Sequence, residues 1–534
     1  MLGGDNLSRS DQNRQPGIWP EADLPPQPEA QAAPVAPPLP APPRLQTVNR
    51  EQFCWHAVDV EKLVGPDHLV RAIWELVGRL DLSRYTARVK AVAGVAGRDA
   101  YDPRLLISLW IYAYSQKIGW AREVARRCEY DPAFQWLTGL EVVNYHTLAD
   151  FRVEHAQALD QLFAQLLGVL SSEGLVSLEN VALDGTKVKA SASGKSFHRE
   201  QTLRAHLTAA RQRVKEMGDP RQQEEAGRRA AARQRAVAAE RVRRLEQALE
   251  ELQKVQAAPQ ARVEKSAQRV SETDPEARPM RQSDGGYAPS HNVQIATDAA
   301  HGIIVGARVT QAASDQHEMA PGLAEVERQT QQKPQHLIVD EGYTTRENIL
   351  EAAQQGVDLI GSSLEPNADA TRRRLQQRGV EPAFYPDQFR YHPDPNHYTC
   401  PQGKLLPYQT TKHDRVGVER HVYKARAADC QACPLRPQCG AGKHGRRIVR
   451  SEPVREVEEY RAKMQTAAAR SLYRLRAPVA EFSNLWLKTK LGLRQFAVRG
   501  LAKVRCEVLW ASLTYNLQQW YRLRWKVGLQ PAEG

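Results

Sequence analysis

Cysteines are scarce in this sequence, and long hydrophobic runs are missing. Seven cysteines in 534 residues cannot form the framework of a disulfide-stapled protein, so the reducing cytosol is the expected compartment. The longest compact apolar run, Leu105 to Tyr114, is flanked by Arg104 and Lys117 and is far shorter than the roughly 20 residues that span a bilayer. No signal peptide is visible. These features exclude a small stapled scaffold and predict a cytoplasmic protein without a membrane partner.

Acidic residues are outnumbered by basic ones. The chain has 74 Lys and Arg against 62 Asp and Glu, which gives a formal net charge of +12 and an isoelectric point near 9.3. A basic surface attracts polyanions, and nucleic acid is favoured over a membrane because no basic amphipathic anchor stands out. The length and the hydrophobic content of 41% suit a protein of several globular domains.

Composition divides the chain before any motif is considered. Residues 1–48 hold 11 of the 33 prolines and cannot bury enough apolar surface to become ordered, so we expect a disordered tail rich in Pro and Ala. Residues 49–175 have helical periodicity, and Thr147 is expected to cap the helix that carries Arg152. Arginines on successive short helices would suit DNA binding in the manner of a helix-turn-helix. A packing domain with solvated arginines explains the pattern equally well.

Residues 199–281 are polar and helical. Apolar residues recur there at helical spacing, and we predict a helical hairpin inserted into a larger domain. The recurring residues are Val242, Leu245, Leu249, Leu252 and Val255. The segment holds 19 Lys and Arg against 13 Asp and Glu, a net charge of +6. This excess permits phosphate contact, but a solvated hairpin would show the same charge.

Two short apolar runs end in an acid. Within residues 180–190, NVALDGTKVKA, the apolar run is followed by Asp184. Within residues 336–343, a second apolar run is followed by Asp340. We expect each run to be a buried strand that holds its carboxylate at the exposed end, whereas an isolated Asp-Gly is most often a simple turn. A β-hairpin and a helix are predicted between the two runs, and a helix and a strand after the second. These elements are expected at 292–297 with 303–310, 316–329, 346–355 and 357–361.

The order of these elements resembles that of bacterial insertion-sequence transposases of the DDE type. The LDGT sequence at 183–186 and the VDEGY sequence at 339–343 carry the resemblance, which extends over roughly residues 50–525. It implies an α/β fold, an RNase H-like mixed sheet flanked by helices, with acids on the first and fourth strands and a glutamate on a late helix. Asp184 and Asp340 take the first two positions. Asp298 competes for the second, but it lies at a predicted hairpin tip.

The C-terminal segment supplies the third acid. Residues 470–526 contain 12 Lys and Arg and only two acids, Glu481 and Glu507. The segment resembles the family's Tyr-x2-Arg, Glu, x6-Lys signature, whose members here are Tyr473, Arg476, Glu481 and Lys488. Four residues, rather than the more common three, separate Arg476 from Glu481. We expect Pro478 to lie in the first turn of the helix that carries Glu481, with Arg476 before that helix.

A cysteine-rich insertion at residues 366–450 separates the second and third acids. It contains a C-x29-C-x2-C-x5-C pattern, formed by Cys400, Cys430, Cys433 and Cys439. Four thiolates at such spacing suit a structural, tetrahedral zinc ion in a small zinc-ribbon-like fold. The usual double CxxC is incomplete, so reduced unpaired cysteines are the alternative. His392, His397 or His413 could replace one of the ligands.

The resemblance implies a metal-dependent DNA transposase. Asp184, Asp340 and Glu481 would hold two Mg²⁺ or Mn²⁺ ions, because carboxylate oxygens select such hard cations. The reaction would be cleavage at the ends of a mobile element, followed by strand transfer of the 3′ hydroxyl into target DNA. The residues that would hold phosphates of the terminal inverted repeats and of the target are Tyr473, Arg476, Lys488 and Lys187.

Domain boundaries and partners follow from the same resemblance. The catalytic core is expected at 176–198, 282–365 and 451–526, interrupted by the hairpin and by the cysteine-rich insertion. Pairing of two DNA ends implies a homodimer in the synaptic complex, at the bacterial nucleoid within the cytoplasm. Two alternatives are a nuclease of the same fold that does not join ends, and a non-catalytic DNA-binding protein derived from a transposase.

Overall fold

Helices make up the first part of the described chain. The computed structural model describes residues 57–87, 89, 91, 99–217, 225–257, 267–362, 368–413, 419–451 and 454–528, so the predicted tail at 1–48 lies outside the described residues. The first helices are η1 (Val60–Leu63), α1 (Leu69–Gly78), α2 (Ser83–Thr86), α3 (Pro103–Ser115), α4 (Ala121–Tyr130), α5 (Pro132–Thr138), α6 (Tyr145–Glu154) and α7 (Ala156–Ser172). The prediction that Thr147 caps α6 is wrong. Asn144 is the cap, because its side chain accepts a hydrogen bond from the backbone N–H of His146.

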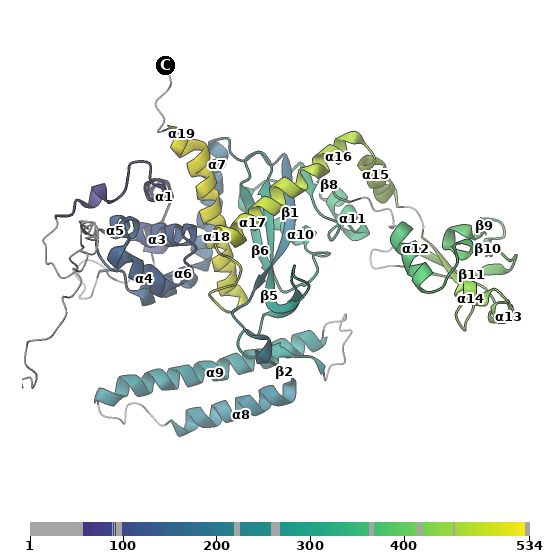
Figure 1. Cartoon of the computed structure of the whole chain (residues 1–534), viewed down its shortest axis with the longest axis horizontal. Coiled ribbons are helices and arrows are strands. Elements are labelled where there is room, and N and C mark those ends of the chain that lie inside the picture. Colours follow the sequence, from purple (N-terminus) through teal and green to yellow (C-terminus); the bar gives the residue numbers. More distant parts are fainter. Residues whose placement is uncertain are drawn as a thin grey trace, which may run out of the picture. The chain divides into compact units, whose positions relative to one another are not determined.

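The central sheet has six strands and is mixed. Its strands are β1 (Asn180–Lys189), β4 (Arg278–Arg281), β5 (Tyr287–Asp298), β6 (Ile304–Thr310), β7 (His336–Ile338) and β8 (Asp358–Ile360). They follow the order β4-β5-β1-β7-β8, and β6 also pairs with β5. β5 runs antiparallel to β1 and β6, whereas β7 and β8 run parallel to β1. The helices α10 (Met319–Thr330) and α11 (Arg346–Gln354) connect the later strands, so the predicted α/β fold is confirmed (Figure 1).

Strand β1 is longer than the sequence predicts. We expected Asp184 at the exposed end of the strand, but β1 continues to Lys189. The reason is that β5 pairs with β1 along its length, from Val181 opposite Asp298 to Lys189 opposite Ser290. Asp184 therefore lies in the middle of a paired strand, where the backbone holds its side chain firmly.

The C-terminal helices complete the core. They are α15 (Arg455–Met464), α16 (Ala467–Arg474), the π-helical turn η7 (Ala477–Glu481), α17 (Phe482–Thr489), α18 (Leu501–Trp520), a second π-helical turn η8 (Tyr521–Trp525) and α19 (Lys526–Gly528). α18 is buried over most of its length and contacts β6, α7 and α3 (Figure 1). Its Trp510 and Trp520 are buried in the main core.

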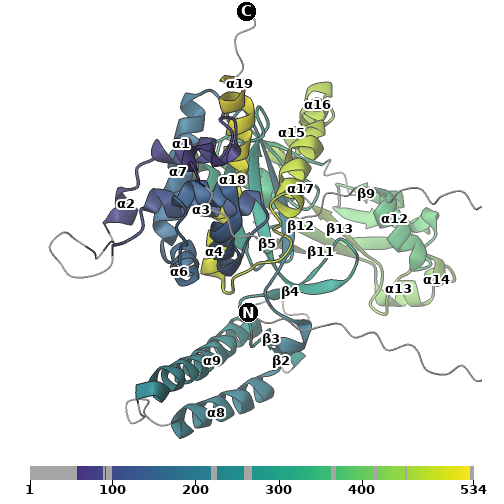
Figure 2. The same ribbon diagram turned by 60° about the vertical axis from the view of Figure 1, so that its left-hand side comes forward.

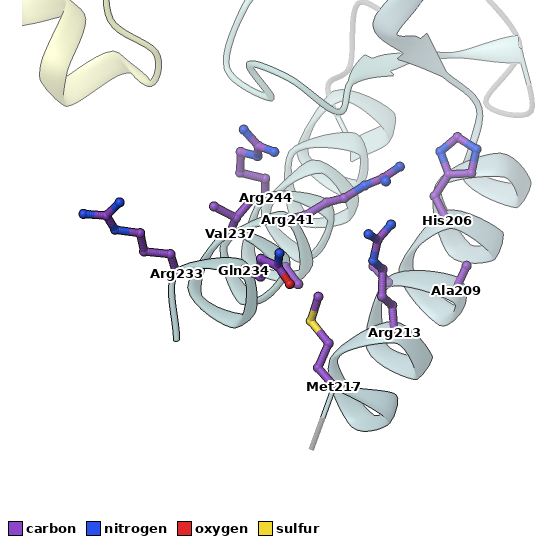
Figure 3. A pocket seen from close by; sticks show the side chains of 11 residues that line it. His206, Ala209, Arg213, Met217, Arg233, Gln234, Val237, Arg241 and Arg244 are labelled. Carbon is purple, nitrogen blue, oxygen red and sulfur yellow. The ribbon is translucent and has the colours of Figure 1, made fainter. Parts of the chain in front are cut away.

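The predicted helical hairpin is confirmed. It consists of η2 (Gly194–Ser196), β2 (Phe197–His198), α8 (Glu200–Glu216), α9 (Glu225–Ala257) and β3 (Val270–Ser271). Leu203 and Leu207 of α8 pack against Leu245 and Leu252 of α9, as the helical spacing indicates. Figures 2 and 3 show the two helices side by side, and Figure 3 labels Arg213, Gln234 and Arg241 among the side chains that line the pocket between them. Strands β2 and β3, which come before α8 and after α9 in the sequence, pair in antiparallel register. We call this end of the hairpin the closed end, and the end where α8 finishes and α9 begins the open end.

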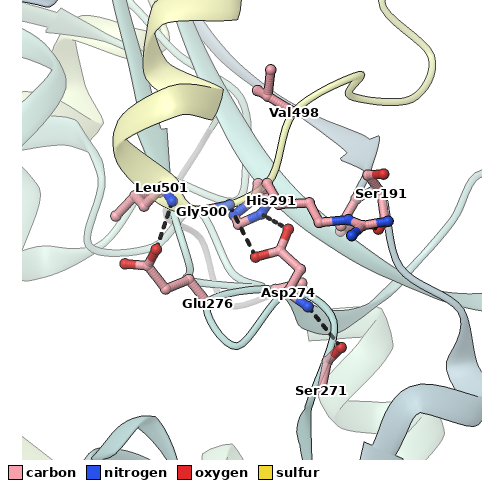
Figure 4. A network of polar contacts seen from close by, with 12 residues as sticks. Ser191, Ser271, Asp274, Glu276, His291, Val498, Gly500 and Leu501 are labelled. Carbon is pink, nitrogen blue, oxygen red and sulfur yellow. Dashed lines mark hydrogen bonds and ion pairs between the residues drawn. The ribbon is translucent and has the colours of Figure 1, made fainter. Parts of the chain in front are cut away.

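A polar network fixes the chain after β3 to the sheet and to α18 (Figure 4). The fully buried Asp274 accepts a hydrogen bond of 3.2 Å from the backbone N–H of Gly500, and its other oxygen lies 3.3 Å from Nε2 of His291 on β5. Glu276 accepts a 2.7 Å hydrogen bond from the backbone N–H of Leu501. Both carboxylates therefore lie at the N-terminus of α18, where the helix dipole favours negative charge.

The cysteine-rich insertion has its own small sheet and core. Its elements are α12 (Ala368–Gln377), η5 (Pro382–Phe384), η6 (Pro386–Gln388), β9 (Arg390–His392), β10 (His397–Thr399), β11 (Leu405–His413), β12 (Glu419–Lys424), α13 (Ala427–Gln431), α14 (Arg436–Cys439) and β13 (Arg447–Ser451). The five strands are antiparallel neighbours in the order β13-β12-β11-β10-β9. Phe389, Leu406 and Tyr423 form its buried centre. Within the described residues, every helix of the protein is too short or too polar to span a bilayer.

Candidate active site

Asp184 and Asp340 meet on adjacent parallel strands. Ala182 of β1 is aligned with Ile338 of β7, and each aspartate lies two residues further along its segment. Asp340 follows the end of β7, and its negative charge acts on Asp184 of the neighbouring strand β1, so the two carboxyl groups are near each other. The structure thus brings together the first two predicted acids, although 156 positions of sequence separate Asp184 from Asp340.

The carboxyl group of Asp184 is half-buried and held by two donors. Its Oδ1 accepts a 2.9 Å hydrogen bond from the backbone N–H of Gly185, and its Oδ2 accepts a 3.0 Å bond from Nδ2 of Asn484 on α17. The pKa of Asp184 is raised from 3.8 to about 6, first by burial and then by the negative charge of Asp340, while Arg476 acts in the opposite direction. Carboxylate oxygens are the ligands that hard divalent cations such as Mg²⁺ prefer, and a bound cation would offset the negative charge of Asp340 on Asp184.

Glu481 lies at the end of the π-helical turn η7. Its side chain is 61% exposed, and its Oε1 accepts a 3.1 Å hydrogen bond from Nη2 of Arg476. A π-helical turn repeats every five residues, so residues 476 and 481 fall on the same side of the helix. The carboxylates of Asp184, Asp340 and Glu481 do not all lie within 4.8 Å of one another. The charges of Asp340 and Arg476 both act on Asp184, and Arg476 is also the ion-pair partner of Glu481, so Arg476 links Glu481 to the two aspartates.

The π-helical turn corrects the prediction for Pro478. We expected a new helix to begin there, with Arg476 before it. Instead α16 runs through Leu475 and Arg476 into η7 and then α17, and Pro478 lies inside η7. The extra residue between Arg476 and Glu481 is absorbed by the wider π turn, so the two side chains still meet.

Helix α17 presents two further side chains to Asp184. Asn484 donates to it directly, and the ammonium group of Lys488 is near enough for the charge of Asp184 to raise its pKa. The net pKa shift of Lys488 is downward, first because the side chain is buried and then because Lys187 lies nearby. Lys488 is thus brought to the site, as predicted. Tyr473, by contrast, is half-buried against the main core.

Asp315 is a residue of this site that the sequence did not reveal. Its carboxylate binds Nζ of Lys187 at 2.9 Å, and it accepts hydrogen bonds from Nδ2 of Asn292 at 2.6 Å and from Nε2 of Gln294 at 2.7 Å. Oε1 of Gln294 in turn accepts a hydrogen bond from the hydroxyl of Tyr343, three residues after Asp340. The signal that could have indicated this network is the alternation of Asn292 and Gln294 with the apolar Val293 and Ile295, because buried amide side chains need hydrogen-bond partners.

Lys187 is therefore not a free cation. Lys187 and Asp315 are each about four-fifths buried, with side-chain exposures of 19%, and both oxygens of Asp315 lie within 3.2 Å of Nζ. The charge of Asp315 also contributes to the raised pKa of Asp184. Asp315 thus fixes a positive charge beside the two candidate metal-binding aspartates.

Two other acids near the core have structural roles. Asp298 is fully buried and accepts hydrogen bonds from the backbone N–H groups of Ser177 and Leu178, at 3.1 and 2.7 Å. Glu507, the second acid of the basic C-terminal segment, is buried and accepts hydrogen bonds from the backbone N–H groups of Ala497 and Val498. Burial raises the pKa of Glu507. Neither acid is available at the exposed site that Glu481 occupies.

Several arginines of the N-terminal helices are engaged within the protein. Arg152 is buried, donates a hydrogen bond to the backbone oxygen of Gly119 and lies 4.8 Å from the ring centroid of Trp110. Arg126 and Arg127 both form ion pairs with Glu123. The suggestion that Arg152 faces DNA is therefore wrong, because the side chain is part of the core.

The four cysteines of the insertion converge. They line a small cavity of about 30 Å³, and burial raises the pKa of the Cys439 thiol. Backbone N–H groups point at two of the sulfurs, from Lys404 to Cys400 and from Arg446 to Cys430, each at 3.3 Å. The histidines offered as substitutes lie elsewhere: His392 stacks on His397, and His413 pairs with Glu419. Four thiols that line one cavity, with amides directed at two of the sulfurs, are a donor set that suits a tetrahedral zinc ion, although within the described residues no three of the sulfurs lie within 4.8 Å of one another.

Comparisons with known proteins match both ends of the described chain. Residues 58–154 match the family model described as "Transposase domain (DUF772)". Residues 399–521 match the model described as "Transposase DDE domain", a range that contains the four clustered cysteines and Glu481. No curated protein matches the chain. These matches support the resemblance to insertion-sequence transposases of the DDE type that the sequence indicates.

Proposed function

We propose that this transposase cleaves DNA at the ends of a mobile element and joins the released 3′ hydroxyl to target DNA. The observation that carries the proposal is the pair of Asp184 and Asp340 on adjacent parallel strands, with Asn484 bound to Asp184. The strand order β6-β5-β1-β7-β8, with β5 alone antiparallel to its neighbours, supports an RNase H-like core. If the short edge strand β4 is set aside, Asp184 lies on the first strand of that core and Asp340 just after the fourth.

We assign two Mg²⁺ or Mn²⁺ ions to Asp184, Asp340 and Glu481. The residues fit such cations, because all three are carboxylates, and burial followed by the negative charge of Asp340 raises the pKa of Asp184. Two ions about 4 Å apart, when bound, activate the attacking oxygen and stabilise the leaving oxygen of a phosphoryl transfer. Acids on opposite sides of such a pair need not contact each other, which suits the separation of Glu481 from the two aspartates.

The positive side chains of the site suit the DNA backbone. Arg476 can bind a phosphate with two parallel hydrogen bonds, whereas Lys488 acts as a point charge. Lys187, held in place by Asp315, adds a fixed positive charge beside Asp184. Tyr473, one turn before Arg476 on the same helical segment, would support that arginine from the core side.

The remaining modules have supporting roles in this proposal. The helices of residues 49–175 would bind DNA, with their exposed side chains rather than with Arg152. Cys400, Cys430, Cys433 and Cys439 would hold a structural zinc ion that stabilises the insertion. Pairing of two DNA ends would require a homodimer.

Cleavage and joining assays on DNA that carries the element's terminal repeats test the proposal. Asp184→Ala, Asp340→Ala and Glu481→Ala should each reduce Mg²⁺-dependent cleavage at least a thousandfold and leave DNA binding within a few-fold of wild type. Glu341→Ala is the matched control, because this exposed acid is the immediate neighbour of Asp340. Full activity of Asp340→Ala would contradict the site assignment. If the wild-type protein cleaves DNA but forms no joined products, it is a nuclease. If the wild-type protein binds DNA but does not cleave it, it is a non-catalytic DNA-binding protein.

A further inference from the structure

A second cluster of metal-binding side chains lies at the closed end of the helical hairpin, where strands β2 and β3 pair. His198 ends β2, His206 lies two turns into α8, and Glu272 follows β3. His198 is opposite Val270 in the β2–β3 register, and Val270 and Glu272 share a face because they are two residues apart. The side chains of His198 and Glu272 are therefore diagonal neighbours on one face of the ribbon, and α8 brings His206 over them.

The distances between these side chains are short. One potential ligand atom from each of the three residues lies within 4.8 Å of the other two, and within the described part of the chain this is the one place where three His, Cys, Asp or Glu residues approach so closely. Nδ1 of His206 is 2.8 Å from Oε2 of Glu272, and the two imidazole rings meet edge to face with centroids 5.1 Å apart. All three residues are half-buried. Ligands of a tetrahedral zinc ion are about 3.3 Å apart at bond lengths of about 2.0 Å, so the widest pair needs to close by about 1.5 Å.

We infer that His198, His206 and Glu272 bind a zinc ion. Two imidazole nitrogens and one carboxylate oxygen are a donor set that suits zinc, whereas Mg²⁺ and Ca²⁺ prefer oxygen donors alone. Three protein ligands leave a fourth position for water or an anion. The site is separate from the four cysteines and from the aspartate pair, and the inference does not depend on the proposed function.

The charges around the cluster suit an anion at the fourth position. A groove of about 630 Å³ between α8 and α9 begins at His206 and is lined by Arg213, Arg241 and Arg244. Figure 3 shows Arg241 extending from α9 toward His206 on α8. Nη2 of Arg241 lies 4.0 Å from Oε1 of Glu272, whereas Oε2 faces Nδ1 of His206. The arginines thus offset the negative charge of an added anion, and the carboxylate shields the ion from the nearest arginine.

The zinc ion would lock the closed end of the hairpin. His206 and Glu272 are 66 residues apart in sequence, so one ion that binds both closes a long loop. The chain that follows Glu272 enters the network of Asp274 and Glu276 at the start of α18. A rigid closed end therefore fixes the hairpin to the sheet at one point, while its open end contains the arginine-lined groove.

Zinc stoichiometry of the full-length protein tests the inference. Wild type and the variants His198→Gln, His206→Gln and Glu272→Gln are dialysed against Zn²⁺, and bound metal is measured per chain. Each variant should lose one zinc equivalent relative to wild type. His336→Gln is the matched control, because Nδ1 of His336 also lies 2.8 Å from a carboxylate, that of Asp358, without a second imidazole. Wild-type stoichiometry in all three variants would overturn the inference.

A second measurement counts the zinc bound by the histidine cluster without a contribution from the four cysteines. It also does not require that the single variants of the histidine cluster fold well. In a Cys430→Ser, Cys433→Ser protein, one zinc equivalent should remain, and Co²⁺ in its place should absorb without the sulfur-to-metal band that thiolate ligands produce. Addition of His206→Gln to this protein should remove the last equivalent. No zinc in the cysteine double variant, despite a helical circular dichroism spectrum like that of wild type, would show that the histidine cluster does not bind the metal.

Discussion

Replacing Asp184 by asparagine should stabilise the metal-free protein at neutral pH. The pKa of Asp184 is about 6 in the folded protein and 3.8 as its ordinary value, because burial and the charge of Asp340 disfavour the ionised form. Between these values the folded protein binds the proton more tightly than the unfolded chain does. The free energy of unfolding of wild type must therefore fall as pH rises through this window. With 1.36 kcal/mol per pKa unit, the loss amounts to about 3 kcal/mol, and it is complete above the folded pKa.

The asparagine variant lacks this pH dependence. Its single carbonyl oxygen can accept from Gly185 or from Asn484 but not from both, which costs about 1 kcal/mol at every pH. We expect Asp184→Asn to be slightly less stable than wild type at about pH 4 and about 2 kcal/mol more stable at about pH 7.5. Urea unfolding in EDTA, followed by tryptophan fluorescence, measures the difference. Mg²⁺ should then stabilise wild type and leave the variant unchanged.

The control for this prediction uses the neighbouring acid. Asp340→Asn removes the second cause of the raised pKa, so the pH dependence of Asp184 should weaken and move to lower pH. Glu341→Gln, one residue further on and exposed, should leave it unchanged. A stability difference between wild type and Asp184→Asn that is the same at all pH values would refute the reasoning, because the carboxyl group would then titrate alike in the folded and unfolded chains.

Three further predictions concern other parts of the protein. Asp315→Asn should lower the free energy of unfolding by about 3 kcal/mol, because it leaves Lys187 buried without its partner. Adding Lys187→Met to that variant should restore most of the lost stability, and a double-mutant cycle measured by urea unfolding tests both expectations. Cys433→Ser should release one zinc equivalent and make the cysteine-rich insertion sensitive to limited proteolysis. Deletion of Val479 should convert the π turn to α-helical spacing and leave Arg476 and Glu481 paired at positions i and i+4, so cleavage of terminal-repeat DNA should persist and circular dichroism should be unchanged.

Local patterns in the sequence were enough to predict most elements of the sheet. The apolar runs before Asp184 and Asp340 gave β1 and β7, and the polar break at residues 298–302 gave the hairpin of β5 and β6, because strand period and turn chemistry are short-range signals. The length of β1 was underestimated, because residues 185–189 are polar or basic and only their pairing with β5 makes them a strand. Pairing between distant segments is not visible in a local window.

The errors at the site have a similar cause. The function of Asp315 depends on donors from Lys187, Asn292 and Gln294, which come from two other strands. The π turn that ends at Glu481 could not be predicted, because a proline such as Pro478 usually indicates the first turn of a new helix. The sequence also does not show how two consecutive helices are rotated relative to each other. The sequence pattern did not show that Arg152 is buried, because its burial depends on a contact with the ring of Trp110 on another helix.

The position of α18 sets an order for the assembly of this protein during synthesis. The helix begins at residue 501 of 534, yet it contacts α3 and α7 from the first third of the chain and β6 from the sheet. Those earlier elements therefore have apolar faces that stay uncovered on the ribosome until nearly the whole chain has been made. A product that terminates before α18 would keep β1 and β7 but lack the helix that packs beside β6. Such fragments would leave uncovered the faces of α3, α7 and β6 that α18 contacts in the structure.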